Sequence, residues 1–137
     1  MLAPEAIHVS MSTVSPALSR RLAQEHRRAG QSYVAAPVLG NPDLAQARKL
    51  FVLVAGASPA LARVKPMLER LGLQVFLLDD DPGTANLMKV AANTLTALTL
   101  QSMGEVLALL RKGGLPPQVV FDVLTGSLFD ERARFVT

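Results

Sequence analysis

The feature that most constrains the fold is a long helix-forming stretch in the second half of the chain. Residues 82–112 contain no proline after Pro82 and no pair of glycines, and the turn Asp81-Pro82-Gly83 supplies a helix start. At 1.5 Å per residue such a helix would be about 45 Å long, which is too long for one layer of a small α/β domain. We therefore expect this helix to connect two domains and to end at Gly113-Gly114.

The residues before this helix alternate between short apolar runs and amphipathic segments. Ser15-Pro16 and Ser58-Pro59 each show a capping residue followed by proline, which is typical of a helix start, and Asp43 is a candidate cap for a short helix. Pro37 indicates an edge or a bend in one strand, and Pro66 indicates a kink or a break in one helix. The pattern predicts strands over 6–11, 32–39, 50–55 and 75–78, and helices over 16–29, 43–48, 58–71, 82–112 and 116–125.

This order, in which strands and helices alternate before two final helices, is typical of an α/β fold. It predicts the second half of a Rossmann-like parallel sheet with flanking helices, followed by a long interdomain helix and the start of an all-helical domain. We place the division between residues 1–81, the C-terminal half of the Rossmann-like domain, and residues 82–137, the long helix and the beginning of an all-α dimerisation domain.

Composition narrows the classes of function. The chain has no cysteine, which excludes disulfides and thiol nucleophiles, and half of its residues are apolar, which indicates burial against another copy of itself. The net charge is +3, but helical spacing places the basic cluster on a solvated face, so we expect no nucleic-acid partner; the cluster is Arg20, Arg21, Arg27 and Arg28. The longest uncharged stretch, residues 90–104, is too short for a membrane span, and with no signal peptide the expected compartment is the cytoplasm.

A polar stripe runs along the predicted long helix. Asn86, Lys89, Asn93 and Thr96 are spaced by three, four and three residues, so they share one face of an otherwise apolar helix. Partial burial of a lysine disfavours its ammonium form, which suits a group that exchanges protons near neutral pH. Periodicity leaves a second interpretation open, in which Lys89 extends to solvent and Asn93 satisfies a neighbouring backbone group.

Three motifs in order resemble those of the β-hydroxyacid dehydrogenase family, which belongs to the 6-phosphogluconate dehydrogenase-like superfamily and includes 3-hydroxyisobutyrate dehydrogenase, tartronate semialdehyde reductase and glyoxylate reductase. Residues 10–16, Ser-Met-Ser-Thr-Val-Ser-Pro, resemble its Asp-x-Ser-Thr-x-Ser-Pro substrate loop, and residues 36–40, Ala-Pro-Val-Leu-Gly, resemble its Ala-Pro-Val-Ser-Gly loop. Residues 86–93, Asn-Leu-Met-Lys-Val-Ala-Ala-Asn, resemble its catalytic lysine motif. The resemblance extends over essentially the whole chain.

The resemblance implies a role for each motif. Lys89 would be the general acid in carbonyl reduction and the base in alcohol oxidation, and Asn93 would hold the substrate oxygen. Ser12 and Thr13 would lie where cofactor and substrate meet, binding both. The backbone of Leu39, Gly40 and Asn41 would bind the substrate carboxylate. The cofactor would be NADP or NAD, the substrate a small carboxylate or aldehyde, and the assembly a homodimer or a higher homo-oligomer.

The sequence departs from the family at several positions. Leu39 stands where many relatives have serine, Asn41 where many have glycine, and Ser10 where aspartate is usual, so a plain 3-hydroxyisobutyrate specificity is not supported. None of the nine glycines forms the Gly-x-Gly pair of a dinucleotide-binding loop. We expect that half to precede Met1, which makes the chain a fragment and on its own inactive.

Two alternatives follow from these departures. One is a catalytically inactive fragment that acts only as a dimerisation or interaction module. The other is an imine reductase-like relative, although those enzymes commonly replace the lysine with another proton donor. Of the remaining polar clusters, Asp79-Asp80-Asp81 is expected to cap the long helix, and His8 and His26 lack a ligand-like spacing, so no metal site is expected.

Overall fold

The structure is a computed structural model that describes residues 2–127. The chain divides into two compact units, residues 1–93 and residues 94–137, which are described separately below. The predicted domain division after residue 81 remains a prediction.

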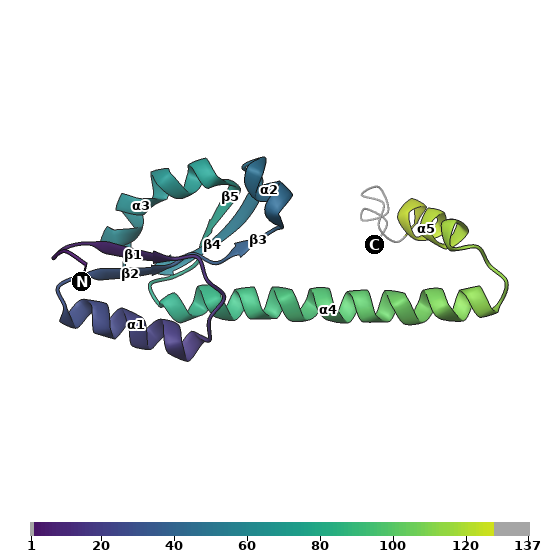
Figure 1. Ribbon diagram of the computed structural model, residues 1–137, viewed down its shortest axis with the longest axis horizontal. Coiled ribbons are helices and arrows are strands. Elements are labelled where there is room, and N and C mark those ends of the chain that lie inside the picture. The colour runs from purple at the N-terminus through teal and green to yellow at the C-terminus, as the bar shows by residue number, and fades with distance from the viewer. Residues whose placement is uncertain (1, 128–137) are drawn as a thin grey trace. The chain divides into compact units, whose positions relative to one another are not determined.

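The first unit contains a sheet with helices on both faces, and the predicted α/β fold is confirmed (Figure 1). Every predicted strand and helix is present. The strand predicted over 32–39 is two strands, and Pro37, which has no N–H to donate, lies between them. The elements are β1 (Ile7–Ser10), α1 (Pro16–Arg28), β2 (Ser32–Ala35), β3 (Val38–Leu39), α2 (Pro42–Gln46), β4 (Leu50–Gly56), α3 (Ser58–Leu71), β5 (Gly72–Leu77), α4 (Pro82–Lys112) and α5 (Pro117–Gly126).

The sheet is mixed, which corrects the prediction of a parallel sheet. β1 is parallel to β2 and β4 is parallel to β5, but β4 runs antiparallel to both β2 and β3. A parallel pair needs a crossover of a dozen or more residues, whereas only residues 40–49 separate β3 from β4. The short α2 in that connection returns the chain beside β3 in the opposite direction, with Val38 opposite Val52.

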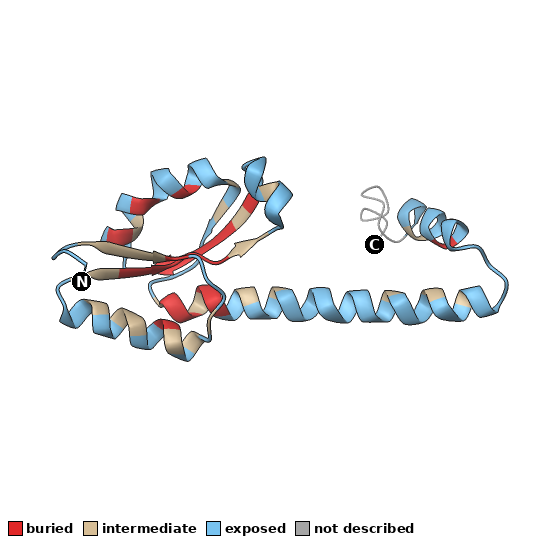
Figure 2. Ribbon diagram, viewed as in Figure 1, coloured by how far each residue is buried: buried red, intermediate tan, exposed pale blue. Residues whose placement is uncertain are grey.

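The core lies on both faces of the sheet, because neighbouring residues of β4 point to opposite sides. Val52 and Val54 pack with Leu68 of α3 on one face. Leu53 and Ala55 pack on the other face with Tyr33 and Ala85, and α1 adds partly buried residues there. Figure 2 shows the buried residues concentrated in the strands, the inner side of α3 and the first turns of α4.

Three expectations about helix ends and breaks need correction. Asn41, not Asp43, caps α2, because its Oδ1 accepts the Leu44 N–H at 2.9 Å. Ser58 lies inside α3 and donates to Asp80 Oδ1 at 3.0 Å; the cap residue is Ala57, which makes no side-chain bond. Pro66 does not break α3, which runs continuously from Ser58 to Leu71.

The second unit consists of the rest of α4 and α5 as far as residue 127. Val120 is buried, but many large apolar side chains are exposed. The most exposed of these are Leu95, Leu98, Leu100, Leu109 and Val123, each at 60% or more. Among the described residues no helix combines the length and the apolar character needed to cross a membrane.

Candidate active site

The loops that follow β1 and β2 leave the sheet at the same end. β1 and β2 are parallel, so the residues that follow them lie at the same end, and the Ala36 N–H donates to the Ser10 carbonyl at 2.7 Å. Ser12 and Thr13 are both exposed in the loop that leaves β1. In open α/β sheets, ligands bind outside the carboxyl ends of parallel strands, which is where these residues lie.

The 39–41 segment has a backbone that only glycine fits well. Gly40 has a φ of +140°, and a Cβ there would lie 2.7 Å from Leu50 Cδ2. Leu39 is half-buried and packs against the core that contains Tyr33 and Leu53. The Asn41 side chain is occupied by the α2 cap. The Leu39 and Asn41 side chains are thus engaged within the fold, and the backbone of Gly40 is exposed.

The loop that follows β1, residues 11–15, is tied to α4 by Asn86. The Asn86 side chain is fully buried; its Oδ1 accepts the Val14 N–H at 3.2 Å, and its Nδ2 donates to Ser19 Oγ at 3.1 Å. Sequence periodicity placed Asn86 in the polar stripe without a separate role. Sequence periodicity also gave no role to Ser19, although a serine on the apolar face of α1 indicates a buried polar contact.

Lys89 and Asn93 follow Asn86 along α4. Lys89 is half-buried, while Asn93 is exposed. Lys89 lies three residues after Asn86, close to one helical turn, so both start on the same side of the helix. The bond from Val14 to Asn86 thus brings the loop with Ser12 and Thr13 to the part of α4 that carries Lys89.

The start of α4 is fixed by the acidic cluster, as predicted. Asp79 accepts bonds from the Asp81 N–H and from Thr84 Oγ1, and Asp81 accepts the Gly83 N–H at 2.9 Å. Asp81 also pairs with Arg20 of α1, at 2.7 Å between Oδ2 and Nη2. The hydrogen bond from Arg20 lowers the pKa of the Asp81 carboxyl, and the same bond raises the pKa of Arg20. The cluster therefore caps α4 and clamps it to α1.

A histidine pair lies on the α1 side of β1, and the sequence spacing gave no sign of it. His8 Nδ1 and His26 Nε2 are 2.8 Å apart, and His26 Nδ1 is 2.8 Å from Gln31 Oε1. Burial, followed by the charge of His26, lowers the pKa of His8. Within residues 2–127, no three acidic, histidine or cysteine side chains are grouped so as to hold a metal ion.

Comparison with known families agrees with this arrangement. The family described as the NAD binding domain of 6-phosphogluconate dehydrogenase matches residues 1–78. The family described as the NAD-binding of NADP-dependent 3-hydroxyisobutyrate dehydrogenase matches residues 83–133. The chain therefore belongs to the β-hydroxyacid dehydrogenase family, within the 6-phosphogluconate dehydrogenase-like proteins.

Individual proteins give the same result. The uncharacterised oxidoreductase YfjR of Bacillus subtilis is 37% identical over 89% of this chain and 43% of its own length. A structure of Mycobacterium tuberculosis 3-hydroxyisobutyrate dehydrogenase with L-serine is 28% identical, with a TM-score of 0.84 over 98% of this chain and 46% of that one. An imine reductase from Myxococcus stipitatus, 24% identical with a TM-score of 0.78 over 88% of this chain and 43% of its own, shares the fold. The chain thus spans less than half the length of the proteins it matches.

Proposed function

We propose that this chain forms the substrate side of an NAD(P)-dependent oxidoreductase that transfers a hydride between a nicotinamide and a small aldehyde or β-hydroxy acid. The observation that carries the proposal is the junction of the 12–14 loop with α4, since the Val14 N–H bond to Asn86 joins two motifs that lie far apart in the sequence. Membership of the β-hydroxyacid dehydrogenase family supports it.

The residues of this chain fit one part of the dinucleotide. NAD or NADP has a pyrophosphate, which such enzymes hold with Gly-x-Gly-x-x-Gly, and no Gly-x-Gly occurs in this sequence. The exposed hydroxyls of Ser12 and Thr13, at the carboxyl end of β1, fit the nicotinamide side instead. When bound, the nicotinamide supplies the hydride chemistry, and the protein supplies orientation and protons.

Lys89 is the proposed proton donor and acceptor. In carbonyl reduction its Nζ gives a proton to the carbonyl oxygen, and in alcohol oxidation it takes the proton from the hydroxyl. Asn93, one turn further along α4, donates a hydrogen bond to that oxygen through its carboxamide. The backbone at Leu39, Gly40 and Asn41 binds the carboxylate, which favours substrates that carry an acid group close to the reacting carbon.

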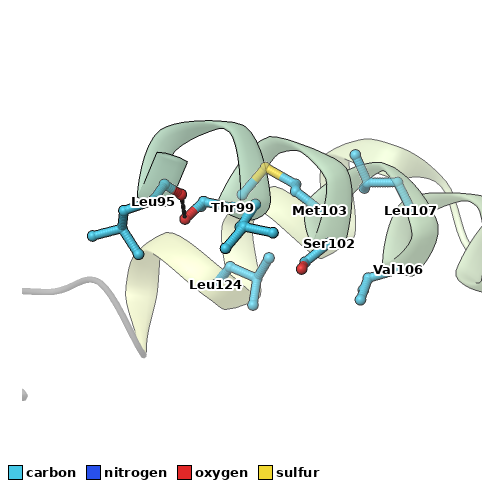
Figure 3. Close-up of a pocket in the computed structure, with 8 residues that line it drawn as sticks. Leu95, Thr99, Ser102, Met103, Val106, Leu107 and Leu124 are labelled. Atoms are coloured by element: carbon cyan, nitrogen blue, oxygen red, sulfur yellow. Dashed lines mark hydrogen bonds between the residues drawn. The ribbon is translucent and has the colours of Figure 1, made fainter. Parts of the chain in front are cut away.

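We also propose that residues 1–81 belong to the Rossmann-like domain and residues 82–137 to a dimerisation domain. The second unit supports the latter, because an apolar groove of about 420 Å³ lies between α4 and Leu124 of α5. Figure 3 shows Leu124 pointing toward α4 beside Thr99 and Ser102. A second copy of the chain would bury such surface at about 25 cal/mol per Å² of apolar area, and a two-fold pair is the commonest arrangement.

Two other functions, an interaction module and an imine reductase, were also considered for this chain. Exposed apolar residues such as Leu95 and Leu109 fit an interaction module without catalysis. The likeness to an imine reductase concerns the fold alone, and the lysine at position 89 favours the dehydrogenase.

The test is a graft in which this chain replaces the matching segment of the Mycobacterium tuberculosis 3-hydroxyisobutyrate dehydrogenase. The graft should oxidise NADH or NADPH in the presence of small aldehydes that carry a carboxylate. In parallel, the 137-residue chain is titrated with β-hydroxy acids by NMR, where the amides of Thr13, Gly40 and Asn93 should shift. A folded graft without activity, together with unshifted amides, would contradict the proposal.

A further inference from the structure

We infer that Asn86 is a positioning residue, which holds the 12–14 loop at a fixed position relative to Lys89 through its bond to the Val14 amide. The inference rests on the proposed function, because it assigns to Asn86 the alignment of the two halves of that site. Asn86 itself touches neither substrate nor cofactor in this proposal.

The contacts of Asn86 join three elements that meet at the first turns of α4. Its Oδ1 accepts the backbone N–H of Val14 at 3.2 Å, and its Nδ2 donates to Ser19 Oγ of α1 at 3.1 Å. Ser19 Oγ also lies 3.3 Å from the Pro82 carbonyl oxygen and 3.4 Å from Tyr33 Oη of β2. Asn86 and Ser19 are both fully buried, so these bonds form in a setting of low dielectric constant, where an unpaired polar group is costly.

The loop is anchored on both sides of Val14. The Ser10 carbonyl accepts the Ala36 N–H at 2.7 Å, and Ser15 Oγ accepts the Leu18 N–H at 3.2 Å. Ser12 and Thr13 lie between these anchors and are exposed, so the sheet and the helix cap alone fix only the ends of the loop. The bond at Val14 is the contact that orients the loop toward α4.

A carboxamide meets both demands of this position without a charge. The Val14 N–H needs an acceptor, and Ser19 Oγ receives a donor. Leucine has nearly the same shape but offers neither group. An aspartate keeps the acceptor for Val14, and in its protonated form it also keeps a donor for Ser19. Replacement of Asn86 by leucine or by aspartate therefore separates the shape of the side chain from the bond to the loop.

The first test measures amide hydrogen exchange in the 137-residue chain by NMR. In the wild type the Val14 amide should be protected. Asn86→Leu should reduce that protection by roughly tenfold, the equivalent of one lost hydrogen bond, while the Leu53 amide of β4 stays protected as an internal control. Asn86→Asp should keep the Val14 protection. Ser19→Ala is the matched control, because it removes the other partner of Asn86 and leaves the acceptor for Val14 in place.

The second test measures steady-state kinetics in the grafted enzyme. Asn86→Leu should lower kcat by up to about a hundredfold, because a small misplacement of reacting groups costs that much, with the KM for the dinucleotide unchanged. Asn86→Asp should restore most of kcat, and Ser19→Ala should have a smaller effect than Asn86→Leu. Equal losses of kcat in Ser19→Ala and Asn86→Leu would overturn the inference. A Val14 amide that is unprotected in the wild type, or as well protected in Asn86→Leu as in the wild type, would also overturn it. Failure of the proposed function can be told apart from failure of this inference. If the proposed function is wrong, the Val14 exchange result stays as expected, but Lys89 substitutions no longer lower kcat.

Discussion

A methyl group added at Gly40 should destabilise the fold far more than one added at Gly30. Both glycines have positive φ, +140° and +68°, so alanine is strained at each. At Gly30 the added Cβ meets nothing within 4 Å, and the strain alone predicts a loss of about 1–2 kcal/mol in the free energy of unfolding. This variant measures the conformational term by itself.

At Gly40 the added Cβ would lie 2.7 Å from Leu50 Cδ2. Leu50 is buried, so its side chain can move only against packed neighbours, and such overpacking costs about 1–3 kcal/mol. Gly40→Ala should therefore lower the free energy of unfolding by about 2–5 kcal/mol in total. Urea denaturation of the two variants and the wild type would measure the difference. Equal losses for Gly40→Ala and Gly30→Ala would refute the proposed steric contact between the 39–41 segment and β4.

Three further predictions concern the histidine pair, the cofactor and self-association. The pKa of His8 is lowered in the folded chain, so the neutral imidazole stabilises the fold at a pH above the unfolded-state pKa of about 6.5, and this stabilisation should be lost as the pH falls below that value. Thermal unfolding from pH 7 to pH 5 should therefore show a steeper fall in melting temperature for the wild type than for His8→Phe. The 137-residue chain has no Gly-x-Gly, so calorimetric titration with NADH or NADPH should show weak binding or none, and a micromolar affinity would mean that the cofactor site is misplaced. The exposed apolar residues of α4 predict a self-associating chain; light scattering over a dilution series should give at least a dimer, while a stable monomer mass at micromolar concentration would contradict it.

The positions of helices and strands could be predicted from the sequence because local signals set them. Proline and glycine at the ends of segments located α1, α3, α4 and α5 to within a few residues. Strand direction could not be predicted in this way, because the residue pattern of a strand is the same in a parallel and an antiparallel pair. The short connection between β3 and β4 was the available signal for the mixed sheet.

The candidate site was predictable in part. The motif spacing is the basis for proposing Lys89 and Asn93 as site residues, but their different exposure depends on how far the rest of the fold covers α4. The role of Asn86 depends on a bond to Val14, 72 residues earlier in the chain, and no local pattern encodes such a distant contact. The His8–His26 pair could not be predicted for the same reason, because the two residues come together only when α1 packs on β1.

Substitution of Lys89 tests the central claim most directly. In the grafted enzyme, Lys89→Ala should lower kcat for aldehyde reduction by about 10²–10⁴-fold, which is typical for loss of a general acid, with the KM for the dinucleotide nearly unchanged. Lys65→Ala is the matched control, because Lys65 is an exposed lysine of α3 that pairs with Glu69, and it should leave kcat unaltered. A kcat for Lys89→Ala within a few-fold of the wild-type value would contradict the assignment of Lys89 as the proton donor and acceptor.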